Sequence, residues 1–386
     1  MIWFLIIDDW LYAASFVRDL VAMADRNNRV RCIFPVVRGL PKLDHNNLSM
    51  DLVHVRRQLP IVSYLWFCIT ALVRLVKDCR IWDVIILTAD VFPLALPWLL
   101  AGLLGHNQRP IFAVREPSPP VEIHSSRRYY APVLRCLSLR LLSHFSNPVF
   151  AISPMHAREI IAKFKVSPHN VHVWPSSVDT NMFDPEKHST DRDKIRRELK
   201  MADSFLLIYH GDLSDERGLC ELVEATRMAR EQCEGLRLLL LGKGRAERKL
   251  RVLARSLSLD GVVLFHGPVA YSDVPRFIAA ADAGVIPLPD HPQWRYQTPI
   301  KLLEYMAMGK PVVVTDIAAH RWLLRNGRTA FYCGHGSPAE IAKAVLECAR
   351  SKGTTQETDR HRIAAKFTPH AIADELLRIF GDLIHK

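Results

Sequence analysis

Short apolar runs alternate with amphipathic segments along most of the chain. In the first half, the runs with strand character are IWFLII, RVRCIFPVV, DVIILTA, PIFAVR, PVFAIS and NVHVWP. Helical patterns separate most of them, for example over Ala13 to Ala24 and Arg128 to His144. The second half repeats the alternation with FLLIYHG, LRLLLLG, VVLFHG, AGVIPL, PVVVT and TAFYC. This pattern predicts an α/β fold of parallel sheets with helices on both faces.

The repeated pattern also indicates two domains, because 386 residues exceed what one hydrophobic core usually serves. We expect doubly wound, Rossmann-like domains over 1–175 and 202–367. The polar, turn-rich segment 176–201 is expected to connect them, and a helix over 368–386 is expected to close the chain. Open parallel sheets bind ligands beyond the carboxyl ends of their strands, so that edge is where functional residues are sought.

Two uncharged stretches, Gln58 to Val73 and Val91 to Gln108, resemble membrane spans but are short or interrupted by proline. A buried helix is favoured for each, peripheral membrane contact comes next, and a true span is least favoured. The first ten residues, MIWFLIIDDW, lack a basic n-region and predict a first strand instead of a signal peptide.

The charge of the chain indicates anionic partners. The net charge is +11 and the isoelectric point is about 9.4. Residues 101–165 hold nine Lys or Arg against three Glu, so this segment is predicted to contact an anionic membrane surface. A solvated face would also explain its arginine-rich part, Arg127 to Arg140. No basic run is interleaved with aromatic residues, which argues against a nucleic-acid partner. Eight cysteines without C-x-x-C spacing indicate a reduced, cytoplasmic chain with neither a disulfide framework nor a zinc site.

A short helix is predicted over Pro299 to Met308, with Thr298 as N-cap, Pro299 at the first helical position and Gly309 ending it. Lys301 and Glu304 are three residues apart and share one face. A solvated ion pair on a surface helix would explain them. However, the helix follows the strand AGVIPL, so its N-terminus should lie at the carboxyl edge of the sheet and favour an anion there.

Three glycine turns are predicted at the same edge. Gly211 lies in YHGDLSDERG, Gly244 in LLGKGRAE and Gly267 in FHGPVA. Arg217 follows the first turn where the next helix begins. An exposed helix-start charge would also explain Arg217, and a plain tight turn would explain Gly244. Together with Lys301, however, the set suits a diphosphate, and Glu304 suits the adjacent hydroxyls of a ribose.

Over residues 150–350, the order of these motifs resembles the family-4 retaining glycosyltransferases of the GT-B fold, in which two Rossmann-like domains face each other across a cleft. The resemblance implies that Glu304 holds the donor ribose and that Arg217 binds phosphate. It also implies backbone contacts to the diphosphate from Pro299, Ile300, Lys301 and Leu302, and contacts to the base from Gly267, Pro268 and Val269. Two positions depart from the family: Tyr296 stands where the first acid of its E-x7-E motif is expected, and Asp212 replaces an arginine.

The first half offers acceptor-side candidates only. Glu116 and His124 flank the loop that follows PIFAVR, and Asp9 follows the first strand together with Asp8. Glu116 and His124 could bind or deprotonate a hydroxyl, although a loop-stabilising Glu and a surface His are equally good explanations. Asp8 and Asp9 could contact the acceptor or cap the next helix.

The expected function is therefore transfer of a sugar from a nucleoside-diphosphate sugar to a hydroxyl of a glycan or lipid-linked acceptor, with retention of configuration. Arg217 and Lys301 would stabilise the leaving diphosphate without a metal or other cofactor. Biosynthesis of a cell-envelope polysaccharide or glycolipid is the expected setting, with the enzyme cytoplasmic and peripheral at the inner face of the membrane. A catalytically silent subunit of the same fold is the main alternative, and a sugar-nucleotide epimerase is a weaker one.

Overall fold

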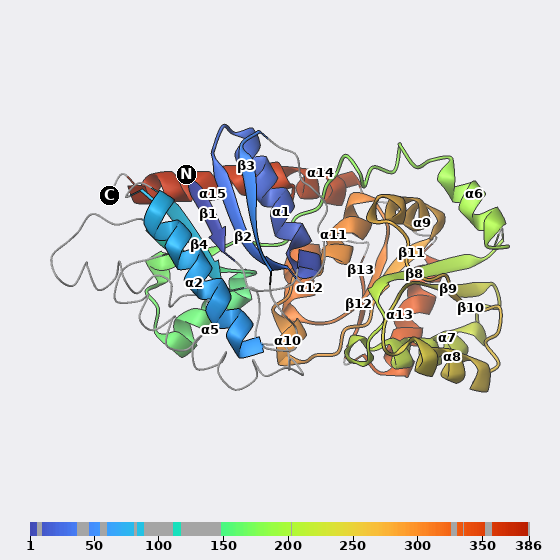
Figure 1. Cartoon of the computed structure of the whole chain (residues 1–386). Coiled ribbons are helices and arrows are strands. Elements are labelled where there is room, and N and C mark those ends of the chain that lie inside the picture. The colour runs from blue at the N-terminus through green and yellow to red at the C-terminus, as the bar shows by residue number, and fades with distance from the viewer. Residues whose placement is uncertain are drawn as a thin grey trace. The chain divides into compact units, whose positions relative to one another are not determined.

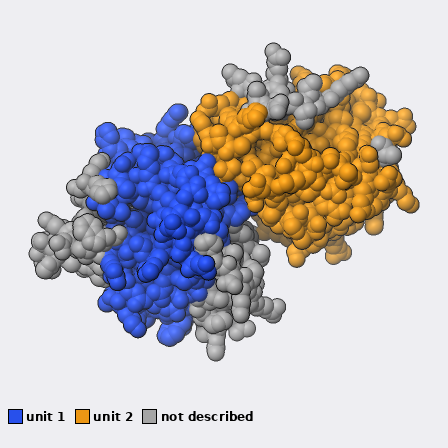
Figure 2. Space-filling model, turned by 90° about the horizontal axis from the view of Figure 1, so that it is seen from above, with its two compact units in different colours: residues 1–177, 369–386 blue, residues 178–368 orange. Residues whose placement is uncertain are grey.

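The structure, a computed structural model, describes residues 1–5, 10–36, 46–54, 60–80, 83–88, 111–116, 148–201, 203–325, 330–334, 336–351 and 357–384. The chain divides into two compact units (Figure 2). Unit 1 comprises Met1–Ser177 and Pro369–Lys386, and unit 2 comprises Val178–Thr368. Each unit is built around its own parallel sheet.

The sheet of unit 1 has the strand order β3-β2-β1-β4-β5-β6-β7, and every pairing is parallel. The strands are β1 (Ile2–Leu5), β2 (Val30–Val36), β3 (Leu48–His54), β4 (Val84–Thr88), β5 (Ile111–Glu116), β6 (Val149–Ala151) and β7 (Val171–Val173). The helices described are α1 (Trp10–Asp25), α2 (Pro60–Asp78), α5 (Pro154–Phe164), η2 (Pro168–Asn170) and α15 (Pro369–Ile384) (Figure 1). Side chains of α2 and α5 share one core cluster with the sheet, and those of α1 and α15 share the other.

Strand β3 was not among the strands predicted from the sequence. It pairs only with β2 and forms one edge of the sheet. Its residues alternate between apolar and polar, and Asp51 forms an ion pair with Arg31 of β2 at 2.5 Å. An edge strand with one polar side lacks the continuous apolar run that marks buried parallel strands, which explains why it was missed.

The stretch Gln58 to Val73 was expected to be a buried helix, and this expectation is half wrong. Helix α2 forms there, and Phe67, Ala71 and Leu75 lie in the core, each 0% exposed. Its opposite face carries large apolar side chains that are more than half exposed. Two further expected helices, over Val91 to Gln108 and over Arg128 to His144, lie outside the described residues.

The sheet of unit 2 is also parallel, with the order β10-β9-β8-β11-β12-β13. The strands are β8 (Phe205–Asp212), β9 (Leu236–Lys243), β10 (Val263–Phe265), β11 (Ala283–Ile286), β12 (Val312–Thr315) and β13 (Ala330–Cys333). The helices are α6 (Asp191–Glu198), η3 (Asp215–Arg217), α7 (Leu219–Arg230), α8 (Glu247–Ser256), η4 (Tyr271–Asp273), α9 (Val274–Ala280), α10 (Pro292–Arg295), α11 (Ile300–Ala307), α12 (Ala318–Leu324), α13 (Pro338–Arg350) and α14 (Glu357–Lys366). All six strands predicted for this half are present.

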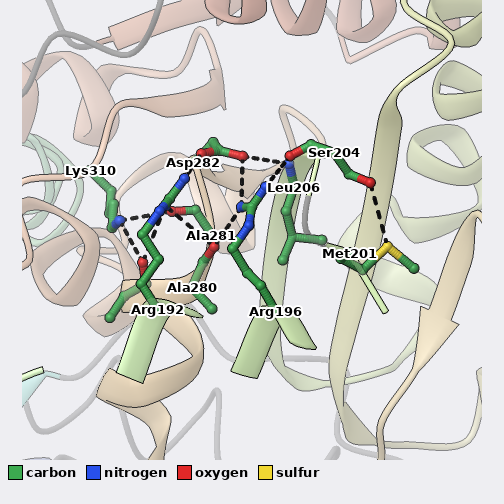
Figure 3. Close-up of polar contacts among 10 residues, drawn as sticks. Arg192, Arg196, Met201, Ser204, Leu206, Ala280, Ala281, Asp282 and Lys310 are labelled. Atoms are coloured by element: carbon green, nitrogen blue, oxygen red, sulfur yellow. Dashed lines mark hydrogen bonds and ion pairs between the residues drawn. The ribbon is translucent and has the colours of Figure 1, made fainter. Parts of the chain in front are cut away.

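Most of the segment expected to be a connection packs into unit 2. Val178, Phe183 and Ile195 are buried in one of its core clusters. Arg192 and Arg196 of α6 both reach Asp282, just before β11, at 2.6 and 3.1 Å (Figure 3). A polar composition therefore does not mark a free linker here, because three apolar side chains and two ion pairs attach the segment to the unit.

The ends of α11 differ by one residue from the expectation. Pro299 is the N-cap, with extended backbone angles, so Thr298 is not the cap and is instead a buried side chain. The C-terminal end follows the predicted glycine signal. Gly309 has a φ of 65°, its N–H donates to the Met306 carbonyl, and the Lys310 N–H donates to the Tyr305 carbonyl. This pair of bonds is a Schellman motif, which glycine favours because it adopts positive φ without a steric penalty.

Candidate functional site

The candidate site of unit 2 lies at the carboxyl end of β8, where the backbone comes close to a lysine. Gly211 has a φ of 118°, and a Cβ atom at this position would lie 3.3 Å from Lys301 Nζ. Any larger side chain at this position would therefore need to displace the ammonium group. Glycine also accepts the positive φ that other residues rarely adopt.

Lys301 lies in the first turn of α11, and its ammonium group covers the ring of Tyr209, with Nζ 3.8 Å from the ring centroid. Burial lowers the pKa of Lys301 well below its usual value, and the charge of Arg217 lowers it further, whereas Glu304 and Asp212 oppose the shift. Within the described part of the chain, Nζ has neither a hydrogen-bond acceptor nor an ion-pair partner. The side chain is partly exposed, so an anion from solvent can reach the ammonium group.

Arg217 is the second cation, placed at the end of η3 immediately before α7. Its guanidinium group stacks over the Trp294 ring, 4.4 Å from the centroid. The Nε atom is buried and has no hydrogen-bond partner among the described residues. Gly218, with a φ of 70°, makes the turn into α7, and the Trp294 indole N–H donates to the Glu216 carbonyl at 3.0 Å. The turn and the aromatic ring therefore fix the arginine without neutralising it.

Glu304 lies one turn further along α11 and is only 1% exposed. The Tyr271 hydroxyl donates to Glu304 Oε1 at 2.6 Å, and His210 Nε2 lies 3.1 Å from Oε2. This burial removes the surface ion-pair explanation of Glu304. A carboxylate offers about four acceptor positions, so one side chain can accept from several donors at once.

His210 and Tyr271 are site neighbours that the sequence analysis missed. His210 precedes Gly211 in β8 and is 8% exposed, and Tyr271 begins η4 in the loop after β10. The only available signal for His210 was a polar residue inside an otherwise apolar strand end. Tyr271 gave no signal, because it meets Glu304 across 33 positions of sequence.

The remaining donor-side candidates have different surroundings. A Cβ at Gly244 would collide with the backbone of Leu213, so close packing accounts for that glycine. Gly267 has a φ of 81° and open space around it, Pro268 is exposed, and Val269 packs partly against the core. Tyr296 is partly exposed in the turn after α10.

The acceptor-side candidates remain predictions. Asp9 and His124 lie outside the described residues, as does Asp8. Glu116 is the last residue of β5, opposite Ala151 of β6, and its side chain also lies outside what the structure describes. Among the described residues there is no group of three or more His, Cys, Asp or Glu that could hold a metal ion. The described helices include none that is both long and apolar enough to cross a membrane.

This arrangement can hold an anion and a diol side by side. Helix α11 opens beside the Lys301 side chain with the N–H groups of Ile300 and Lys301, whereas the Leu302 N–H already donates to the Pro299 carbonyl at 3.0 Å. Two cations and a helix N-terminus match the charge of a diphosphate, and the buried carboxylate of Glu304 matches adjacent hydroxyl donors.

Comparison with known proteins finds similarity in the same unit. Residues 204–351 match the family model of group 1 glycosyl transferases, which covers less than half of the chain. EpsD of Bacillus subtilis (strain 168) is 30% identical over 181 residues, 46% of this chain and 46% of EpsD. The lipopolysaccharide core biosynthesis glycosyltransferase LpsE of Rhizobium meliloti (strain 1021) is 26% identical over 183 residues, 47% of this chain and 51% of LpsE. The chain thus spans about half the length of these curated relatives.

A solved structure extends the likeness to the whole chain. Anabaena Alr3699/HepE, determined in complex with UDP, superposes with a TM-score of 0.75 at 18% identity and covers 99% of each chain. The fold is therefore that of the GT-B glycosyltransferases, with two Rossmann-like parallel-sheet units, as the sequence predicted. The resemblance to group 1 glycosyltransferases is supported over the second unit.

Proposed function

We propose that the chain is a glycosyltransferase that moves a sugar from a nucleoside-diphosphate sugar to a hydroxyl of a glycan or lipid-linked acceptor, with retention of configuration. Synthesis of a cell-envelope polysaccharide or glycolipid is the proposed setting. The LpsE name, which refers to lipopolysaccharide, and the UDP complex of HepE support this choice of donor and acceptor class. UDP is accordingly the first nucleotide to test.

The observation that carries this proposal is the pair of unneutralised cations beside the N-terminus of α11. Lys301 has no acceptor in the described structure, and the Arg217 Nε atom is buried without a partner. Both would gain partners from a diphosphate. Glu304 lies one helical turn away, where it would accept hydrogen bonds from the ribose hydroxyls.

The proposed chemistry places the cations on the leaving group. The bond between the anomeric carbon and the diphosphate oxygen breaks while the acceptor oxygen bonds to the same face of that carbon. The acceptor proton passes to the departing phosphate oxygen, so no protein carboxylate forms a covalent intermediate. Arg217, Lys301 and the α11 amides stabilise the growing negative charge. No metal is assigned a role in this scheme.

A catalytically silent nucleotide-binding subunit is the second candidate, because Tyr296 stands where the resembling family has an acid that helps to hold the transferred sugar. Both candidates bind a nucleoside diphosphate, and only the transferase turns it over. Slow hydrolysis of a nucleotide sugar by the purified protein therefore separates them.

Thermal stabilisation by a panel of nucleotide sugars, with UDP as reference, tests donor binding. A ligand at 100 times its dissociation constant should add about 2.7 kcal/mol to the free energy of unfolding. Glu304→Ala should lose most of this stabilisation. Glu247→Ala is the matched control, because Glu247 is a surface acid of α8 paired with Arg251. Equal stabilisation of both variants would contradict the ribose assignment.

The membrane expectation for residues 101–165 also remains a proposal. Most of that segment, 101–110 and 117–147, lies outside the described residues. The proposed location is the inner face of a cytoplasmic membrane, with the chain peripheral to it. Described residues elsewhere in unit 1, on helix α2, form a more specific candidate surface.

A further inference from the structure

Helix α2 has a second apolar face that nothing in the described structure covers. Six of its large apolar side chains are more than half exposed: Val62 at 58%, Leu65 at 53%, Trp66 at 56%, Ile69 at 57%, Val73 at 61% and Val76 at 66%. We call these six side chains the α2 stripe. Single exposed apolar residues are ordinary on protein surfaces, but a continuous set on one helix marks a contact surface.

The spacing of the stripe shows that it is one surface. Its members recur at intervals of three and four residues, which places them along one side of an α-helix. Phe67, Ala71 and Leu75, each 0% exposed, occupy the opposite side and pack on the sheet of unit 1. Among the described residues only four other large apolar side chains are exposed, three of them less than half, and they are scattered: Met1, Met228, Val252 and Tyr271.

The charges around the stripe favour a negatively charged surface as its partner. Asp78 is the single acid of α2, and it is already paired with Arg31 at 2.6 Å. Lys77 and Arg80, at the end of the helix and just beyond it, are exposed. The chain as a whole carries a net charge of +11. Apolar side chains bordered by cations are the pattern of a helix lying in the interface of an anionic bilayer.

The dimensions of the stripe agree with a helix that lies on a membrane. From Val62 to Val76 the helix rises about 21 Å, at about 1.5 Å per residue, which is too short to cross a hydrocarbon core of about 30 Å. Trp66 belongs to the residue type that prefers the membrane interface. A stable dimer buries about 800 Å² on each partner, with some 20–30 residues a side, and six side chains of one helix fall short of that.

We propose that the α2 stripe inserts into the boundary between headgroups and acyl chains of an anionic bilayer, with the helix parallel to the membrane. Lys77 and Arg80 then lie at the level of the lipid phosphates. This inference extends the proposed function by bringing unit 1 to the surface where a lipid-linked acceptor resides. It moves the principal membrane contact from the basic segment 101–165 to an apolar helix face.

Flotation of the full chain with vesicles tests the inference. One set contains equal amounts of phosphatidylglycerol and phosphatidylcholine, and the other contains phosphatidylcholine alone. We expect stronger binding to the anionic vesicles. Part of it should persist in about 1 M salt, where the Debye length falls to about 3 Å and purely ionic attraction is screened.

The double variant Ile69→Asp with Val73→Asp should lower partitioning by roughly tenfold or more, since it places charges in the middle of the inserted face. Val252→Asp is the matched control: Val252 is 60% exposed on α8 of unit 2, outside the stripe, and its replacement should leave partitioning unchanged. Unfolding curves of both variants establish that they are folded.

Several outcomes would overturn the inference. A wild-type chain that binds neither vesicle does so, as does a double variant that binds as well as wild type. If the wild-type chain is a dimer that the double variant converts to monomer, and neither binds vesicles, the stripe is an interface between two copies. Complete loss of wild-type binding in high salt would show ionic attachment only.

The proposed function is tested separately, because vesicle binding needs no donor and UDP stabilisation needs no vesicle. If the chain floats with vesicles but binds no nucleotide sugar, the membrane role of the α2 stripe is supported and the transferase proposal is contradicted. If the chain binds UDP but not vesicles, the donor site is supported and the membrane role of the α2 stripe is contradicted.

Discussion

Lys301 lies in the first turn of the short helix α11 and Lys310 lies just beyond its end, and burial lowers the pKa of both. Their surroundings are otherwise opposite. Lys310 Nζ donates to the carbonyls of Ala279 and Ala281 at 2.9 and 2.7 Å, close to Asp282 and its two arginines (Figure 3). Lys301 Nζ lies over an aromatic ring and has no acceptor among the described residues.

The difference separates a structural cation from a functional one. At Lys310 two backbone carbonyls inside the protein already accept hydrogen bonds from the ammonium. At Lys301 no described residue accepts a hydrogen bond from Nζ, so this position remains available to an added anion. Buried polar groups are nearly always paired, so an unpaired cation at a strand end indicates a ligand site.

The largest expected effect comes from removing the carboxylate of Asp282, which pairs with Arg192 and Arg196 beside Lys310. Burial alone would raise the pKa of Asp282, but hydrogen bonds from Arg192 and from the Leu206 N–H outweigh it, and the net pKa is lowered. Asp282→Asn removes the carboxylate that pairs with Arg196, which is 6% exposed. We expect a loss of about 3 kcal/mol in the free energy of unfolding, at the lower end for a buried ion pair.

Chemical denaturation at neutral pH measures this loss, with Asp260→Asn, an exposed acid of the same unit, as control. The lowered pKa also fixes the sign of the pH dependence. The contribution of Asp282 is complete above the unfolded value of about 3.8 and disappears as the pH falls through the lower folded value. A difference between wild type and Asp282→Asn that grew on acidification would contradict this assignment.

The second prediction replaces each of the two lysines, in separate variants, by methionine. Lys301→Met should lower the turnover number for donor hydrolysis by about 10²-fold or more, since it removes a cation from the leaving group. The same change should leave the unfolding midpoint equal or higher, because no hydrogen bond is lost and a desolvated charge is removed. Lys310→Met should have the opposite effects. It removes two hydrogen bonds, so the free energy of unfolding should fall by about 1–3 kcal/mol and the unfolding midpoint with it, while turnover stays unchanged.

Hydrolysis rates and unfolding midpoints of the two variants, measured in parallel, show which lysine acts on the leaving group and which stabilises the fold. Lys301→Met with full turnover, or Lys310→Met with impaired turnover and wild-type stability, would reverse the roles assigned here. The comparison needs no acceptor, since donor hydrolysis reports on the leaving group alone.

How far the sequence predicts these environments depends on the range of the contacts. Unit 2 was predicted strand by strand because buried parallel strands are continuous apolar runs, and the end of α11 was predicted because Gly309 and Pro311 are local signals. The partners of Glu304 and Lys310 come from distant segments that no local pattern connects. Helix α2 shows the same limit, because an apolar sequence predicts burial on all sides and one side is exposed.

The third prediction concerns proton uptake, a smaller effect specific to the unpaired lysine. The pKa of Lys301 is lowered in the free protein, and a bound diphosphate would raise it again. Between those two values the complex holds more protons than the separate partners. Binding of UDP should therefore take up protons, at most one per site from this lysine, and affinity should fall as the pH rises.

Calorimetric titration with UDP in buffers of different ionisation enthalpy measures the uptake. A pH of about 8 is suitable, because it lies about two units above the second pKa of a phosphate. Lys301→Arg is the matched control: arginine stays protonated and should abolish the uptake while retaining a cation. The same uptake in this variant, or none in wild type, would refute the linkage to Lys301.

The smallest effect is expected at Tyr271, whose hydroxyl donates to Glu304 Oε1 at 2.6 Å. Tyr271→Phe keeps the ring beside Phe183, with centroids 5.6 Å apart, and removes the hydroxyl alone. His210 still lies beside the other carboxylate oxygen, so Glu304 should remain oriented but less firmly held. The loss of one hydrogen bond, about 1 kcal/mol, should weaken UDP binding by a few-fold. Tighter binding by Tyr271→Phe would mean that the hydroxyl competes with the ribose for the carboxylate, and Tyr271 would then close the site against the donor instead of preparing it.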